Sequence, residues 1–252
     1  YLPFFDVEYP SAESETITIR HLLNHSSGLP NTGPEIVGWI HYDGEPGWNQ
    51  TDLIREKLPD YAVLSYEPGT NGVYTNVGYM LLAAVIEAVS GQTYEAYIVE
   101  HILEPLEMTQ TGFSYTDAMS AAEATGAHPS VDVQSLLLPL VGIDTGSAIR
   151  ERQNGLLWFN HVYSDQNGPT GLIGSPTDLA RFVLAYLNGG ELDGQRILSE
   201  EMVTMMTHES HIAAGNTPEA AAFDDSHHGL GWTVVPTGDS FYLLTTIHIS
   251  GR

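Results

Sequence analysis

The stretch Tyr74-Thr75-Asn76 places a phenol and an amide two residues apart, directly ahead of a long apolar run. A phenol can act as a base near neutral pH only if cationic neighbours lower its pKa from about 10. An amide beside it could hold a polar substrate group. A tyrosine and an asparagine before a helix are more often only a turn and a cap. The chemical interpretation of this stretch therefore depends on the residues that accompany it.

A second candidate is His25-Ser26-Ser27, where an imidazole and two hydroxyls could form a base and a nucleophile. The alternative, which we favour, is that these side chains satisfy loose carbonyl groups at the end of a short helix. No Gly-x-Ser-x-Gly elbow occurs in the sequence.

Histidines gather late in the sequence, but their spacing does not define a metal site. His208-Glu209-Ser210-His211 departs from the His-Glu-x-x-His pattern of zinc hydrolases. The segment Asp224–His228 could supply ligands, although we interpret it as a solvated polar loop because no regular element fixes its geometry. We therefore predict neither a metal nor a cofactor.

Composition narrows the classes of partner. The 252 residues include 32 acidic and 8 basic residues, giving a formal net charge of -24, and no cysteine. This charge argues against nucleic acid and anionic membranes as partners. The apolar run from Val77 to Ser90 has 14 residues, whereas a membrane span needs about 20. We predict no stable membrane insertion and leave the oligomeric state open.

Several helices and strands are expected around these residues. Asn76 and Gly91 stand where the N-cap and C′ glycine of a buried helix belong. Residues 106–165 show no clear pattern, and residues 240–250 alternate like a strand. The remaining predictions are a helix capped by Thr18 that stops at Gly28, an amphipathic piece near Thr51–Leu58, helices capped by Thr93, Ser175 and Ser199, the first of these ended by Pro105, and a hairpin at Glu191–Ile197.

Separated stretches together resemble the serine β-lactamase-related family, which holds class C β-lactamases, penicillin-binding DD-peptidases and related esterases. The stretch from Ile17 to Pro30 looks like a signature helix of that family, and Tyr74-Thr75-Asn76 resembles its Tyr-x-Asn motif. The segment Gly171–Met206 is similar to a later helical part. Gly229-Leu230-Gly231-Trp232 resembles the strand before its third motif. The resemblance covers most of the sequence outside residues 106–165.

The resemblance implies acyl transfer through a serine. Tyr74 would be the catalytic base and acid, and Asn76 would hold the substrate amide. A Lys- or His-Ser/Thr-Gly motif would line the substrate site; Ser250 and Gly251 fit its last two positions, and His248 lies one position early. The implied substrate is a small molecule or a peptidoglycan-like peptide. The implied location is extracytoplasmic, either periplasmic or secreted.

The sequence also departs from this family. Its single lysine is Lys57, Ile54 stands three residues before it, and no Ser-x-x-Lys occurs. We expect that motif to lie upstream and interpret the chain as a truncated piece, inactive alone. The alternatives are a non-catalytic binding or regulatory relative, and an unrelated carbohydrate- or metal-binding protein based on loops 39–48 and 224–228.

The predicted fold is an α/β (α+β) β-lactamase/transpeptidase-like fold, with an antiparallel sheet flanked by helices and a mostly helical subdomain. Residues 1–252 would form one partial domain, incomplete at both ends. Within it, residues 17–165 would be mostly helical, and residues 166–252 would return to the sheet.

Overall fold

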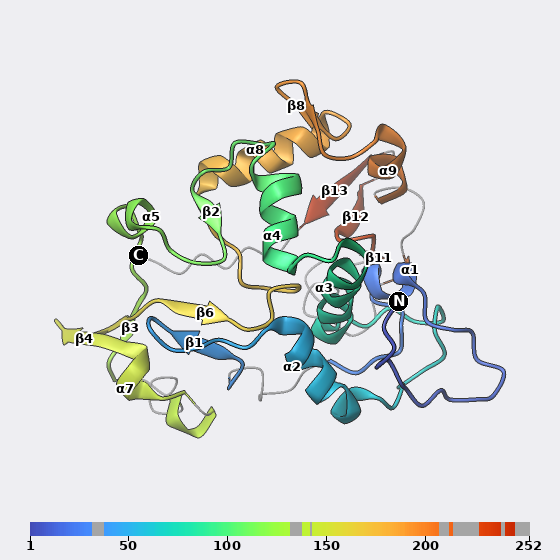
Figure 1. Ribbon diagram of the computed structural model, residues 1–252, viewed down its shortest axis with the longest axis horizontal. Coiled ribbons are helices and arrows are strands. Elements are labelled where there is room, and N and C mark those ends of the chain that lie inside the picture. The colour runs from blue at the N-terminus through green and yellow to red at the C-terminus, as the bar shows by residue number, and fades with distance from the viewer. Residues whose placement is uncertain are drawn as a thin grey trace.

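The computed structural model describes residues 1–31, 38–131, 138–141, 143–206, 212–213, 227–237 and 240–244. The chain mixes helices with short antiparallel strands (Figure 1). The helices are α1 (Ile19–Leu23), α2 (Gln50–Lys57), α3 (Asn76–Ser90), α4 (Tyr94–Ile98), α5 (Asp117–Ala121), α7 (Thr145–Ala148), α8 (Pro176–Leu187) and α9 (Glu200–Thr204). Single helical turns cover Leu58–Tyr61, Val99–Leu103 and Leu138–Val141.

The strands form small antiparallel sheets. Among the described residues the largest has four strands, in the order β10-β11-β12-β13. These strands are β10 (Ile212–Ala213), β11 (His227–His228), β12 (Thr233–Thr237) and β13 (Ser240–Leu244). A three-stranded sheet joins β3 (Ala127–Pro129), β5 (Leu156–Phe159) and β4 (Ile149–Gln153). Two-stranded sheets pair β1 (Ile40–Tyr42) with β6 (Val162–Ser164), β2 (Thr111–Gly112) with β7 (Ile173–Gly174), and β8 (Glu191–Leu192) with β9 (Gln195–Arg196).

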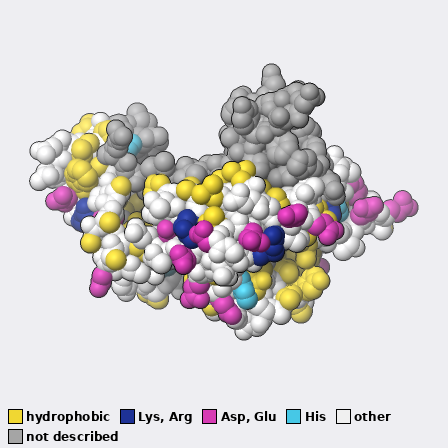
Figure 2. Space-filling model, turned by 90° about the horizontal axis from the view of Figure 1, so that it is seen from above, with side chains coloured by type: hydrophobic (Ala, Val, Ile, Leu, Met, Phe, Trp, Pro, Cys, Tyr) yellow, Lys and Arg dark blue, Asp and Glu magenta, His cyan; other side chains and the backbone are white. Residues whose placement is uncertain are grey.

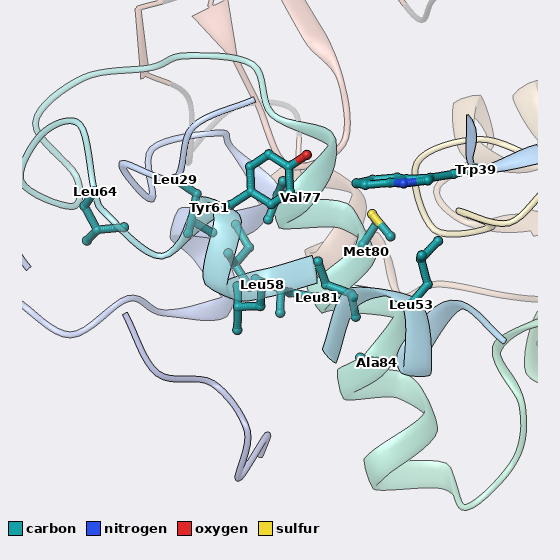
Figure 3. Packing of buried hydrophobic residues seen from close by; sticks show 12 residues of the cluster. Leu29, Trp39, Leu53, Leu58, Tyr61, Leu64, Val77, Met80, Leu81 and Ala84 are labelled. Carbon is teal, nitrogen blue, oxygen red and sulfur yellow. The ribbon is translucent and has the colours of Figure 1, made fainter. Parts of the chain in front are cut away.

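Helix α3 lies at the centre of the main hydrophobic core and contacts α1, α2 and α4 (Figures 1 and 3). Its side chains Val77, Met80 and Leu81 are fully buried, so the apolar run of the sequence does form a buried helix. Gly91 ends the helix with a φ of +72°, as its position predicts. The core also includes Leu22, Leu29, Trp39, Leu53, Ile54, Leu58, Tyr61, Leu64 and Ala84.

Most helix starts follow the predicted caps. Thr18, Thr93, Ser175 and Ser199 each accept a hydrogen bond from a backbone N–H in the first turn. The hairpin of β8 and β9 also forms where it was predicted. The helix that Thr93 starts continues through the turn Val99–Leu103, and Glu104 follows it, directly before the predicted stop at Pro105. Local side-chain chemistry therefore determines these boundaries.

Two predicted boundaries are wrong. Asn76 is the first residue of α3 and not its cap; the cap position belongs to Thr75. The first helix ends with Asn24 as its C-cap, four residues before Gly28. In both places the backbone follows contacts with distant segments, described below, rather than the local cap pattern.

A second core cluster lies under α8 and packs Leu103, Leu106, Met108 and Ala185 together. Asp178, in the first turn of α8, is buried and fixes this helix to β2. One of its carboxylate oxygens accepts from the Gln110 N–H at 2.7 Å and from Thr111 Oγ1 at 2.9 Å. Asp178, which the sequence predicts as an acid in the first turn of a helix, therefore also holds that helix against a distant segment of the chain.

We predict that Asp178→Ala lowers the free energy of unfolding by about 2 to 3 kcal/mol, because it leaves a buried N–H and hydroxyl without their acceptor. Asp52 is the matched control, since it occupies the same helix position in α2 but is exposed and pairs with Arg55. Asp52→Ala should cost less than about 1 kcal/mol. Urea unfolding of the two variants measures the difference, and equal losses would contradict the anchor role.

The β1–β6 pair carries a network of aromatic and acidic side chains. Asp165 is buried and accepts from the Trp48 N–H at 3.0 Å, with His41 Nδ1 2.8 Å away. His161 stacks on Tyr115 and places its ring nitrogens 2.9 Å from Asp43 and 2.5 Å from Glu123. These contacts hold loop 39–48 against β6. Within the loop, the Trp39 side chain is buried against Tyr61, whereas Trp48 is exposed.

Candidate active site

Tyr74, Thr75 and Asn76 form the entrance to α3, and their side chains alternate between outside and inside. Thr75 has extended backbone angles and is fully buried, whereas Tyr74 is 38% exposed. Because neighbouring side chains of an extended segment point to opposite sides, Tyr74 and Asn76 lie on the same, open side. The Tyr74 hydroxyl donates to Asn76 Oδ1 at 3.0 Å. The structure thus brings together the two residues that the sequence singled out.

Thr75 anchors this segment to the loop after α1. Its hydroxyl donates to the Pro30 carbonyl at 2.9 Å, and its N–H donates to His25 Nδ1 at 3.2 Å. The Asn76 N–H in turn donates to Asn31 Oδ1 at 3.0 Å. The side chain that caps α3 therefore comes from residue 31. This explains why the local pattern misplaced the cap.

His25 does not cap α1 as predicted. It adopts a left-handed backbone conformation with a φ of +58° and buries its ring between Tyr74 and Tyr79. Ser26 Oγ donates to Asn24 Oδ1 at 2.6 Å, so this hydroxyl also bonds a side chain and not a helix carbonyl. The interpretation of these residues as carbonyl caps is wrong. The last carbonyl of the helix, on Leu23, accepts instead from the Tyr79 hydroxyl at 2.8 Å.

His228 is a site neighbour that the sequence did not reveal. The prediction of a solvated loop is wrong at its end, because His227 and His228 form β11 and His228 is only 2% exposed. Its ring meets the His25 ring edge-on at a centroid distance of 4.9 Å. The Gly231 N–H donates to the Leu23 carbonyl at 3.4 Å nearby. The late sheet therefore closes one side of the candidate site.

The two tyrosines beside His25 differ as potential bases. Burial, and to a lesser extent the neighbouring Tyr74, raise the pKa of Tyr79, which stays protonated and bonded to the Leu23 carbonyl. Tyr74 has its hydroxyl on the open side, where a substrate can reach it. Among the described residues, Tyr74 is thus the tyrosine whose placement suits proton exchange with a bound molecule.

Burial of the His25 ring, and then the neighbouring His228, lower the pKa of His25 to about 3. A histidine with a depressed pKa stabilises the fold fully above about pH 6.5, and this stability decreases as the pH falls toward the folded-state value. The ring faces Tyr74 just ahead of α3, Tyr79 on α3 and His228 on β11. We predict that His25 contributes about 2.5 kcal/mol less stability at pH 4.5 than at pH 7.

Urea unfolding of the full-length protein and its His25→Asn variant at both pH values tests this prediction. Acidification also neutralises carboxylates, and it does so in both proteins, so the difference between them isolates the histidine. The wild type should lose the larger share of its stability. Equal losses would show that His25 does not titrate as its burial implies.

The other predicted site residues lie elsewhere. Lys57, the single lysine, is on α2 and bonds Glu56 at 2.7 Å, so it does not reach Tyr74. His248, Ser250 and Gly251 lie outside the described residues, as does residue 224. No group of three or more His, Cys, Asp or Glu side chains within the described ranges is arranged to hold a metal ion. In the same ranges no helix combines the length and hydropathy of a membrane span.

The surface carries the acidic excess. Figure 2 shows acidic side chains scattered over the face in view, with fewer Lys and Arg side chains among them. The exposed pairs Arg55–Asp52 and Arg196–Glu191 use two of the 8 basic residues. The candidate site therefore sits in a molecule that repels polyanions.

Comparison with known proteins identifies the family. The chain matches the family described as Beta-lactamase over residues 1–252, and it belongs to that family. A putative D-alanyl-D-alanine carboxypeptidase of Escherichia coli O157:H7 is 28% identical over 229 residues, covering 87% of this chain and 47% of that protein. Penicillin-binding protein 4* of Bacillus subtilis is 35% identical over 104 residues, covering 40% of this chain and 22% of that protein.

The solved structures agree on the fold. The octameric penicillin-binding protein homologue from Pyrococcus abyssi has a TM-score of 0.60 and 26% identity, covering 91% of this chain and 46% of that one. D-amino acid amidase from Ochrobactrum anthropi has a TM-score of 0.61 and 20% identity, and the match covers 93% of this chain and 59% of the amidase chain. The predicted β-lactamase/transpeptidase-like fold class is confirmed. The chain spans about half the length of the first of these curated relatives.

Proposed function

We propose that the full-length protein containing this chain is a serine hydrolase that cleaves an ester, an amide or a β-lactam through an acyl-enzyme. The observation that carries the proposal is the joint presentation of Tyr74 and Asn76 on the open side of the α3 entrance, with their side chains 3.0 Å apart. Membership of the Beta-lactamase family supports the reaction class.

In this proposal Tyr74 exchanges the proton and Asn76 positions the substrate. The tyrosine takes the proton of the attacking hydroxyl and returns it to the leaving group. The Asn76 side chain holds the substrate amide, with its amide nitrogen donating to the substrate carbonyl oxygen. A cation near the phenol is needed to lower its pKa. Ser250, Gly251 and His248 would line the opposite wall, with backbone donors that stabilise the developing oxyanion.

The nucleophile and the activating lysine belong, in this proposal, to a segment outside these 252 residues. The sequence contains no Ser-x-x-Lys, and Lys57 lies on α2, where it is bonded to Glu56. The putative D-alanyl-D-alanine carboxypeptidase is about twice as long as the region that matches this chain. The chain by itself would therefore be a piece of the domain without catalytic activity, with residues 17–165 as the mostly helical part and 166–252 as the return to the sheet.

The substrate class follows from the kinds of relatives. Their names describe a putative D-alanyl-D-alanine carboxypeptidase, a D-amino acid amidase and a hydrolase with promiscuous acyltransferase activity. We propose a small acyl compound or a peptidoglycan-like peptide as substrate, and an extracytoplasmic location where peptidoglycan is found. The acidic surface fits neither nucleic acid nor an anionic membrane as partner.

The test begins with the reading frame around this chain, which should contain a Ser-x-x-Lys upstream of Tyr1. The full-length protein is then assayed with a short-chain p-nitrophenyl ester, a D-alanyl-D-alanine peptide and a cephalosporin. Hydrolysis of at least one, abolished by replacing the upstream serine with alanine, supports the proposal. A frame without that serine, or activity that survives its loss, would favour a binding or regulatory relative on the same scaffold.

A further inference from the structure

His25 holds the candidate base from two sides of the chain. Its Nδ1 accepts from the Thr75 N–H at 3.2 Å, one residue after Tyr74. Its carbonyl oxygen accepts from the Val73 N–H at 3.0 Å, one residue before Tyr74. A single residue therefore binds the N–H groups of both neighbours of the tyrosine, and it does so across about fifty positions of sequence.

The backbone of His25 is held in place by other segments. Its φ of +58° lies in the left-handed region, which non-glycine residues adopt only when surrounding contacts impose it. The Tyr66 hydroxyl donates to the His25 carbonyl at 3.2 Å. Burial raises the pKa of Tyr66, so this donor stays protonated. The Ser26 and Gly28 carbonyls accept from Gly69 and Ser65 at 2.8 Å each, which ties the loop to residues 65–69.

The imidazole ring also packs against the tyrosine itself. The His25 and Tyr74 ring centroids are 4.6 Å apart at an angle of 37°. The Tyr79 ring, on α3, has its centroid 5.0 Å from that of His25, and the His228 ring on β11 meets the His25 ring edge-on. The ring thus limits the positions that the Tyr74 side chain can take. Packing of this kind locks a rotamer and keeps a reacting group within a narrow range.

We propose that His25 is a positioning residue for Tyr74: by accepting the Thr75 N–H at Nδ1 it fixes the distance and direction of the phenol hydroxyl. His25 touches neither the substrate nor the reacting atoms in this scheme and takes no proton. Nδ1 must stay unprotonated to accept the Thr75 N–H, and burial of the ring keeps it so at neutral pH. The inference rests on the proposed role of Tyr74 as the base.

The test uses the full-length protein with three variants of His25. His25→Phe keeps an aromatic ring but loses the acceptor. His25→Asn keeps an acceptor near the Nδ1 position and suits a left-handed backbone. His25→Gly removes both ring and acceptor without backbone strain. It serves as the variant without an acceptor if His25→Phe does not fold. We expect kcat to fall about 100-fold for Phe and Gly, because a displacement near 1 Å costs about that much.

The Asn variant should retain kcat within about 5-fold of the wild type, and KM should change less than about 3-fold in all three, because His25 does not bind substrate. Each variant is also built on a Tyr74→Phe background. If His25 acts through Tyr74, His25→Phe should cost less than about 3-fold in that background, since coupled residues are non-additive. A merely structural role would lower activity in both backgrounds alike.

The outcomes separate this inference from the proposed function. If Tyr74→Phe alone leaves activity unchanged, the proposed function fails, and the positioning role fails with it. If Tyr74→Phe lowers kcat as expected but His25→Phe causes the same fold-loss in the Tyr74→Phe background as in the wild type, the inference alone is wrong. Equal losses in the Asn and Phe variants would also overturn it, because the retained acceptor would then have no effect.

Discussion

Tyr74→Phe in the full-length protein is expected to lower kcat by about 100-fold or more, as loss of a general base does. The reason is geometric. The phenol lies on the open side of the α3 entrance, and its hydroxyl bonds Asn76 at 3.0 Å. Phenylalanine removes this hydroxyl, the proposed site of proton exchange, and leaves the ring that packs on His25. Steady-state hydrolysis of the best substrate, with KM measured alongside, provides the test.

Tyr97→Phe is the matched control for this substitution. Tyr97 lies on α4, where its ring contacts His101 and not the candidate site. The same hydroxyl deletion there should leave kcat within about 2-fold, as surface changes away from a site do. If both variants lose activity to the same extent, or if neither does, Tyr74 is a turn residue and not the base.

The second large effect is expected at Gly28, in the loop that carries His25. Its φ is +82°, and a Cβ at this position would collide with the Tyr66 carbonyl oxygen, which is backbone and cannot swing away. Gly28→Ala therefore combines the strain of a left-handed backbone with overpacking, each of which costs about 1 to 3 kcal/mol. We predict a loss of about 3 kcal/mol or more in the free energy of unfolding.

Gly44→Ala separates the two contributions. Gly44 has nearly the same φ, +81°, but nothing lies within 4 Å of the Cβ that alanine would add. This variant should lose only about 1 to 2 kcal/mol, the cost of the left-handed conformation alone. Urea unfolding of both variants is the measurement. A Gly28 variant no less stable than the Gly44 variant would mean that the loop relaxes away from residue 66.

Features determined by neighbouring residues were predictable from the sequence. The caps at Thr18, Thr93, Ser175 and Ser199 form as predicted because each side chain accepts from a backbone N–H only three positions ahead. The buried helix α3 follows from its apolar run and Gly91. The family resemblance, and with it the fold class, rested on several such stretches taken together, and the family match confirms it.

Features determined by distant contacts were not predictable. Thr75 takes the cap position of α3 because His25 and Pro30, about fifty residues earlier, bind its N–H and hydroxyl. His25 adopts its left-handed conformation within a loop tied to residues 65–69. His228 looks like part of a polar loop in the sequence, and only the pairing of β11 with β12 buries it against His25. A local pattern carries no information about such partners.

The pairing of Tyr74 with Asn76 falls between these cases. The sequence placed the two residues together, and the structure shows their side chains bonded on one side of the segment. Their roles as base and positioning group stay a prediction, as do those of His248, Ser250 and Gly251 beyond the described residues. The structure adds Thr75 and His25: His25 accepts the N–H of the residue after Tyr74 and packs its ring on the tyrosine ring.

The most direct test of the acyl-enzyme claim is the intact mass of the full-length protein after brief exposure to a slowly hydrolysed penicillin or an activated ester. The account predicts one adduct per chain, on a serine of an upstream Ser-x-x-Lys, forming about 100-fold more slowly in the Tyr74→Phe variant. Turnover with no covalent adduct on any serine, or an adduct that forms at the same rate without the Tyr74 hydroxyl, would contradict it.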